Sequence, residues 1–93
     1  MTINVQLFAT LRLALKRGSV TIETEGPVTV GALIDLISKE VGEDIRPWLV
    51  DENDTIHMGT MILLDGKNMI HLDGLDTLVE TPNVAVFPPA GGG

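Results

Sequence analysis

The stretch TVGALIDLISKEVG, residues 29–42, decides the fold because it carries the clearest helix signal in the chain. Thr29 is a typical N-cap residue, and Gly42 is typical of the position just after a helix ends. Between them, apolar residues at helical spacing predict one apolar stripe, made of Val30, Leu33, Ile34, Ile37 and Val41. A lone helix of this kind is buried by packing on one face of a sheet.

Two alternating stretches precede this helix and predict strands. Residues 2–8, TINVQLF, alternate polar with apolar residues, which places Phe8 on the face opposite Leu7. Residues 9–18, ATLRLALKRG, predict a short helical connection to a second strand, SVTIETEG, that ends before Pro27. The two strands suit a hairpin with a long loop.

The chain after the helix is less regular. Pro47, at a first-turn position, predicts a short helix that holds Trp48, and the acidic run 51–54 predicts a solvated loop. An Asp-Gly pair then predicts a hairpin of residues 61–64 and 68–72.

A turn-rich connection leads to a last apolar strand at residues 84–87. The predicted order is therefore β-β-α-β-β-β, which describes an α+β protein with one helix-covered sheet.

Composition limits the classes of function. The 93 residues, 44% of them apolar, suit one small domain. A net charge of −7 argues against binding to nucleic acid or to an anionic membrane. The chain has no cysteine, no signal-peptide pattern and no apolar run of membrane-spanning length, so we expect a cytoplasmic protein.

Residues that carry chemistry are few. His57 and His71 lack the spacing of paired metal ligands, and the acidic run 51–54 lacks the pattern of an EF-hand loop. We therefore expect no metal site, no stably bound cofactor and no catalytic residues in the chain itself.

The last ten residues, VAVFPPAGGG, are the most unusual feature. Pro88 and Pro89 favour an extended exit from the sheet, and Gly91 to Gly93 would fit a channel too narrow for any Cβ atom. We expect a domain at residues 1–87 and a flexible tail at 88–93. The alternative is a frayed end without function.

The chain resembles the ubiquitin-like sulfur carrier family, which includes the small subunit of molybdopterin synthase and the sulfur carriers of thiamine biosynthesis. The family's tail is Phe-Pro-Pro, two variable residues and Gly-Gly, so Gly92 and Gly93 align with the diglycine. Four stretches carry the likeness: INVQLFATLR (3–12), TVGALIDLI (29–37), LDGLDTLV (72–79) and VAVFPPAGGG (84–93).

The resemblance implies a β-grasp fold, in which a mixed sheet of four to five strands packs on one main helix and the first and last strands are central and parallel. It also implies that a ubiquitin-activating-like adenylyltransferase uses ATP to adenylate Gly93, which then becomes a thiocarboxylate. The tail would thread into a partner through Pro88, Pro89, Gly91 and Gly92. That partner would be the large catalytic subunit of molybdopterin synthase or an equivalent sulfur acceptor, which makes this chain a protein co-substrate.

The resemblance further implies a partner surface near the tail, formed by Phe8, Phe87, Met69 and Arg12. Phe87 has an alternative role as a cap on the core. Two other functions stay open: a ubiquitin-like modifier conjugated to lysines, and a sulfur carrier for thiamine, cysteine or tungsten-cofactor synthesis. A β-grasp interaction domain whose tail has no chemistry is a third. Residues 43–60 are longer than in the most compact family members, which suggests a side branch.

Overall fold

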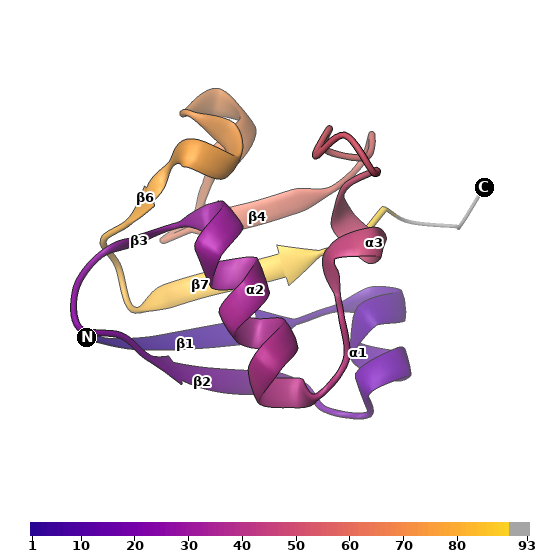
Figure 1. Ribbon diagram of the computed structural model, residues 1–93, viewed down its shortest axis with the longest axis horizontal. Coiled ribbons are helices and arrows are strands. Elements are labelled where there is room, and N and C mark those ends of the chain that lie inside the picture. Colours follow the sequence, from indigo (N-terminus) through magenta and orange to yellow (C-terminus); the bar gives the residue numbers. More distant parts are fainter. Residues whose placement is uncertain (90–93) are drawn as a thin grey trace.

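A five-stranded mixed sheet forms one layer of the molecule, and helix α2 (Val30–Val41) covers one of its faces (Figure 1). The structure is a computed structural model that describes residues 1–89. The spatial order of the strands is β2-β1-β7-β4-β5. Their bounds are β1 (Thr2–Leu7), β2 (Ser19–Glu23), β4 (Met61–Leu64), β5 (Lys67–Asn68) and β7 (Asn83–Phe87).

The first and last strands pair in parallel near the middle of the sheet. Val5 lies opposite Val84, and Leu7 lies opposite Val86. All four are buried under α2, because alternate residues of a strand point to the same face. Strands β2 and β4 flank this pair in antiparallel orientation. The expected β-grasp arrangement is confirmed.

Helix α2 begins and ends where its sequence predicts. The Thr29 hydroxyl accepts a hydrogen bond from the Ala32 amide at 3.1 Å, which satisfies one free N–H of the first turn. Gly42 ends the helix in a left-handed conformation with φ of 76°. The predicted stripe faces the sheet: four of its members are buried and Val41 is half-buried.

Two shorter helices lie at the end of the sheet where β7 finishes, opposite the N-terminus (Figure 1). Helix α1 (Ala9–Leu15) forms the predicted connection after β1, and α3 (Arg46–Leu49) has Pro47 in its first turn, as expected. Within residues 1–89, no helix is long and apolar enough to cross a membrane.

The region between β4 and β7 differs from its prediction. The second strand of the Asp-Gly hairpin, expected at 68–72, is only β5, and the chain then turns into the 3₁₀ helix η1 (Met69–His71). The reason is local: the Asn68 side chain accepts a hydrogen bond from the Ile70 amide at 3.2 Å, which caps the turn and stops the ladder.

A second, two-stranded ladder was not predicted. Strand β3 (Val28–Thr29) pairs with β6 (Leu78–Val79) just before α2 begins, and the 3₁₀ helix η2 (Gly74–Asp76) precedes β6. Two residues are too few to show an alternating pattern, so this pairing depends on contacts between distant segments.

Candidate functional site

The end of β7 is where the predicted site begins. Pro88 is buried and Pro89 is half-buried, so both prolines pack against the domain. The expected boundary between residues 87 and 88 is therefore too early, because these two residues belong to the packed body. The predicted roles of Gly91, Gly92 and Gly93 concern positions outside the described residues.

Gly59 lies next to Pro89 and has a backbone conformation that favours glycine. A Cβ atom at Gly59 would be 3.6 Å from the Cα atom of Pro89, and the backbone of Gly59 has a φ of +93°. Glycine adopts this conformation without the steric penalty that a side chain imposes. Gly59 was not predicted as a site residue, because its only signal in the sequence is a glycine between Met58 and Thr60.

The sheet face that α2 leaves uncovered carries an aromatic pair beside the tail. The rings of Phe8 and Phe87 are stacked, with centroids 4.2 Å apart and planes inclined by 7°. The Phe8 amide donates to the Val86 carbonyl at 3.2 Å, which holds the ring next to the end of β7. Both residues are half-buried, and Phe87 does not cap the core. The predicted pair thus shares one surface.

Met61 and Leu63 extend this surface, and neither was predicted as a site residue. Met61 pairs with Phe87 across the sheet and is 39% exposed, and Leu63 pairs with Ala85. The sequence carries no signal for them, because MILL is apolar throughout and only the structure shows that Ile62 and Leu64 face the core. We call the set Phe8, Met61, Leu63, Ala85 and Phe87 the open-face patch.

Met69 does not belong to the open-face patch. Its side chain is 1% exposed and packs in the core, because η1 turns the chain inward after Asn68. The expectation that Met69 contributes to a partner surface was therefore wrong. The methionine that lies on the open-face patch is Met61, which was not predicted.

Arg12 lies on α1, near the same end of the sheet. It is exposed, and its guanidinium lies over Gly18: a Cβ atom at Gly18 would be 3.2 Å from Arg12 Cζ. Arg12 is thus available to a partner, and its role in binding stays a prediction.

A hollow of about 520 Å³ adjoins the base of the tail on the side of α3. Trp48 is half-buried and packs on the core, whereas Met58 is 97% exposed. The His57 ring holds one edge, with Nε2 3.1 Å from the Pro47 carbonyl oxygen. The tail-base hollow, as we call it, is lined by Thr10, Pro47, Trp48, His57, Met58, Pro88 and Pro89.

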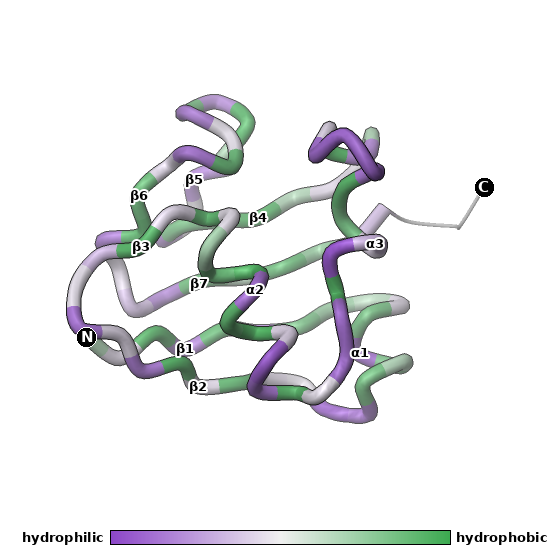
Figure 2. Tube along the Cα trace, viewed as in Figure 1, coloured by the Kyte–Doolittle hydropathy of each residue, from purple (hydrophilic) through white to green (hydrophobic). Residues whose placement is uncertain are grey.

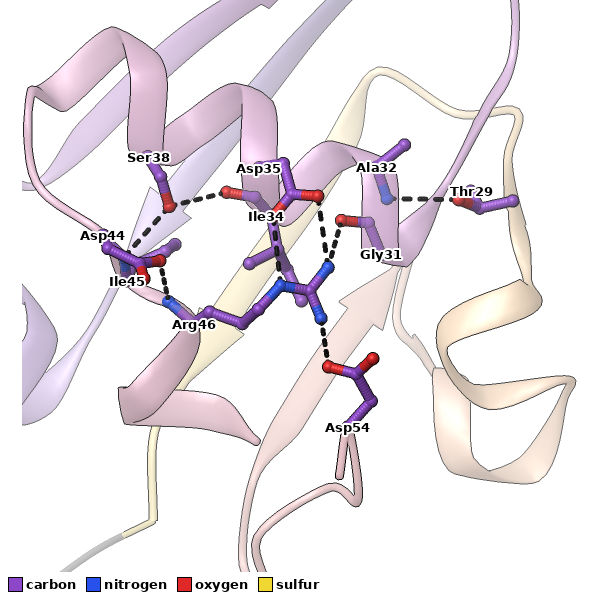
Figure 3. A network of polar contacts seen from close by, with 10 residues as sticks. All are labelled: Thr29, Gly31, Ala32, Ile34, Asp35, Ser38, Asp44, Ile45, Arg46 and Asp54. Atoms are coloured by element: carbon purple, nitrogen blue, oxygen red, sulfur yellow. Dashed lines mark hydrogen bonds and ion pairs between the residues drawn. The ribbon is translucent and has the colours of Figure 1, made fainter. Parts of the chain in front are cut away.

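Arg46 ties the long segment 43–60 to helix α2 (Figure 3). Its guanidinium donates to both carboxylate oxygens of Asp35, at 3.1 and 3.2 Å, and to Asp54 at 2.7 Å. Hydrogen bonding to Asp35 is the main cause that raises the pKa of Arg46, partial burial opposes it, and the charges of both carboxylates add to it. The guanidinium therefore stays charged and links α2, α3 and the loop.

The acidic loop is ordered by its own side chains. The Asp51 carboxylate accepts hydrogen bonds from the Asn53 and Thr55 amides at 2.8 and 3.0 Å. Figure 2 shows this loop after α3 as a hydrophilic stretch, in contrast to the largely hydrophobic β4 and β7. Residues 1–89 contain no cluster of three metal-ligating side chains. The hydrogen bonds of Asp51 thus explain how this acidic loop is held in one conformation.

These features define a class of protein before any comparison: a ubiquitin-like β-grasp domain whose last strand leads directly to a tail between an open-face patch and a hollow. The model of the ThiS family matches residues 5–93, which is nearly the whole chain. The chain therefore belongs to the ThiS family of ubiquitin-like sulfur carriers.

Three relatives place the chain within this group. Small archaeal modifier protein 3 of Haloferax volcanii is 27% identical to this chain over 94 residues, and the alignment covers 100% of both proteins. The solution structure of the HVO 2177 protein of H. volcanii is 26% identical with a TM-score of 0.77, covering 100% of this chain and 87% of the other. A Pyrococcus furiosus protein, provisionally named molybdopterin converting factor subunit 1, has the same fold, with 22% identity, a TM-score of 0.69 and coverage of 97% and 99%.

Members of this family are small carrier proteins that function with activating enzymes and sulfur-acceptor partners.

Proposed function

We propose that this protein carries sulfur as a thiocarboxylate on Gly93. The observation that supports the proposal most is that the family match runs through residue 93 and so includes the glycine tail. The described part of the chain is consistent with it, because β7 leads to Pro88 and Pro89 beside two surfaces that suit a partner.

The chemistry would take place on the tail and not on side chains of the domain. The Gly93 carboxylate attacks the α-phosphorus of ATP in the activating enzyme, which forms an acyl adenylate and releases pyrophosphate. A hydrosulfide equivalent from a sulfur donor then attacks the carbonyl carbon, and AMP leaves with its bonding electrons. The product is a thiocarboxylate, and ATP is used by the enzyme and not bound by the carrier.

The open-face patch would guide the partner to the tail. Exposed apolar side chains next to a polar surround are typical of protein interfaces, and aromatic residues contribute most to their binding energy. Arg12 would add a charged contact from α1. The domain thus positions the tail, and the chain acts as a co-substrate or as the non-catalytic small subunit of a synthase.

We propose molybdopterin synthesis as the pathway that receives the sulfur. Support comes from the Phe-Pro-Pro motif followed by two residues and Gly-Gly, and from the shared fold with the P. furiosus protein. The large catalytic subunit of molybdopterin synthase would then accept the tail. Thiamine, cysteine and tungsten-cofactor synthesis use the same carrier chemistry.

A second candidate is a ubiquitin-like modifier, in which the activated Gly93 forms an isopeptide bond with a lysine. It is favoured by the full-length match to a small archaeal modifier protein. Both functions need the same adenylation step and differ only in whether a sulfur atom or a lysine amine replaces AMP.

A genetic experiment tests the proposal. The chromosomal copy is replaced by one that lacks Gly93, and by a control that carries the distant substitution Glu80→Gln. We expect loss of molybdenum-enzyme activity in the first strain and normal activity in the second. Molybdenum-enzyme activity that survives loss of Gly93 contradicts the molybdopterin assignment. Loss of high-mass conjugates in the first strain, with that activity intact, supports the modifier instead.

A further inference from the structure

The tail-base hollow and the acidic loop beside it form one continuous surface. Pro47 and His57 line the tail-base hollow and also line a second depression of about 410 Å³. Four carboxylates and one guanidinium lie around that depression: Asp44, Asp51, Glu52, Asp54 and Arg46.

The charge around the second depression is only partly compensated. Arg46 is the cation of both ion pairs found within residues 1–89, and it is shared between Asp35 and Asp54. The carboxylates of Asp44 and Asp51 accept hydrogen bonds from backbone amides. Because these amides are uncharged, the negative charge of both carboxylates is not neutralised. Glu52 is exposed and has no ion pair within the described part of the chain. This side of the hollow is therefore anionic.

The other side of the tail-base hollow is apolar. Met58 is 97% exposed at its rim, and the half-buried Trp48 contributes to its lining. The Met58 side chain is long, flexible and unbranched, so it can pack against an apolar group of a partner, because thioethers adapt to irregular surfaces. The surface thus combines an apolar depression with an anionic rim.

The position of the hollow restricts what can occupy it. Pro88 and Pro89 form one wall, so Met58 and Trp48 lie beside the last residues that the structure describes. The complementary chemistry is an apolar side chain flanked by lysine or arginine.

We propose that the tail-base hollow is a second docking surface, which receives a basic and apolar segment of the adenylating enzyme while that enzyme holds the tail. The inference rests on the proposed function and adds to the open-face patch, which lies on a different face of the molecule. The long segment 43–60 then has a role in binding, because it supplies Trp48, Met58 and the acidic loop.

The test measures ATP–pyrophosphate exchange catalysed by the adenylating enzyme of the source organism as a function of carrier concentration. Met58→Ser removes the exposed apolar group, and Glu52→Lys reverses one charge on the anionic rim. Each variant is expected to raise the KM for the carrier by about fivefold, because rim and anchor contacts both contribute to encounter and binding. The Glu52→Lys effect should shrink at high salt.

Two matched variants serve as controls. Leu78→Ser removes another exposed apolar side chain, and Glu80→Lys makes the same charge change as Glu52→Lys. Both positions lie in or just after β6, at the opposite end of the molecule from the tail exit (Figure 1). Both controls should keep the KM of the wild type, and circular dichroism should show that all four variants are folded.

The outcomes separate the two proposals. If the wild-type protein supports no exchange, the proposed function fails, and the inference fails with it. If the wild type is active but either Met58→Ser or Glu52→Lys stays within about twofold of its KM, only the inference is overturned. The inference is also overturned if the controls at β6 raise KM as much as the variants in the hollow.

Discussion

Phe8 and Phe87 show how single side chains prepare the surface beside the tail. Their stacked rings lie on the open face, whereas α2 covers the other face and buries Ile3, Val5 and Leu7 of β1 and Val84 and Val86 of β7. A half-buried aromatic pair stabilises the domain a little and leaves apolar area for a partner. The binding role that we propose for them accounts for two large rings being left partly in water.

The first prediction concerns Phe8→Ala. Affinity for the adenylating enzyme should fall about tenfold, because aromatic residues at the centre of an interface contribute most to binding. The dissociation constant is measured by isothermal titration calorimetry, in which each carrier variant is titrated into the enzyme. Thr21→Ala, on the same face of the edge strand β2, is the control. An unchanged dissociation constant for Phe8→Ala contradicts the assignment of the open-face patch.

Gly59 is the second single position that matters, because of its backbone conformation. With φ of +93°, an alanine there adopts a disfavoured backbone conformation. Gly59→Ala is expected to lower the free energy of unfolding by about 1–2 kcal/mol, measured by urea denaturation. Gly26→Ala is the matched control, since Gly26 has no positive φ and no atom within 4 Å of its Cβ position. Equal stability of the two variants would disprove the strain at Gly59.

Secondary-structure elements were predictable where the pattern is local. Helix α2 follows from its cap, its apolar stripe and Gly42, β1 follows from alternation, and β7 follows from an apolar run that ends at two prolines. The pairing of β3 with β6 did not follow, because two residues cannot show a period. The turn at η1 was not predicted either, because a single hydrogen bond of the Asn68 side chain ends the strand ladder there.

The candidate site also has a part that could be predicted from the sequence and a part that could not. The tail motif and the two phenylalanines could be predicted, because they stand in a linear pattern. Met61 could not be assigned to a face of the sheet, because all four residues of its strand are apolar. The tail-base hollow could not, since it needs α3, the turn at His57 and Pro89 to meet in space.

Arg46 decides how the elements around α2 are held together. Replacing it by methionine removes its bonds to Asp35 and Asp54, and the free energy of unfolding should fall by about 1 kcal/mol, since both carboxylates are well exposed. Urea denaturation measures the difference, and Lys39→Met, on α2, is the control.

The pH dependence of this effect follows from the direction of the pKa shift. The pKa of Arg46 is raised above its ordinary value, so its contribution to stability is complete below that ordinary value and is lost only as the pH rises through the higher folded-state pKa. The stability difference between wild type and Arg46→Met should therefore not change because of Arg46 titration between about pH 6 and about pH 10. A stability of Arg46→Met equal to that of the wild type would contradict the role of the network.

At the scale of the whole molecule, the packed domain ends where the proposed chemistry of the tail begins. Helix α2 and the sheet bury one aliphatic core, and β7 leads from it to Pro88 and Pro89. The surfaces that we propose for partners gather at that same end of the molecule: the open-face patch, Arg12 on α1 and the tail-base hollow. The domain is thus suited to present a tail to several enzymes in turn.

The most direct test of the central claim is the intact mass of the protein purified from its native cells under conditions that preserve thioacids. If Gly93 carries sulfur, we expect a population heavier than the unmodified chain by the difference between one sulfur and one oxygen atom. Fragmentation should locate this difference on Gly93, and a variant without Gly93 should lack it. A protein that carries only the unmodified carboxylate, or only isopeptide adducts to lysines, while the pathway is active would contradict the assignment as a sulfur carrier.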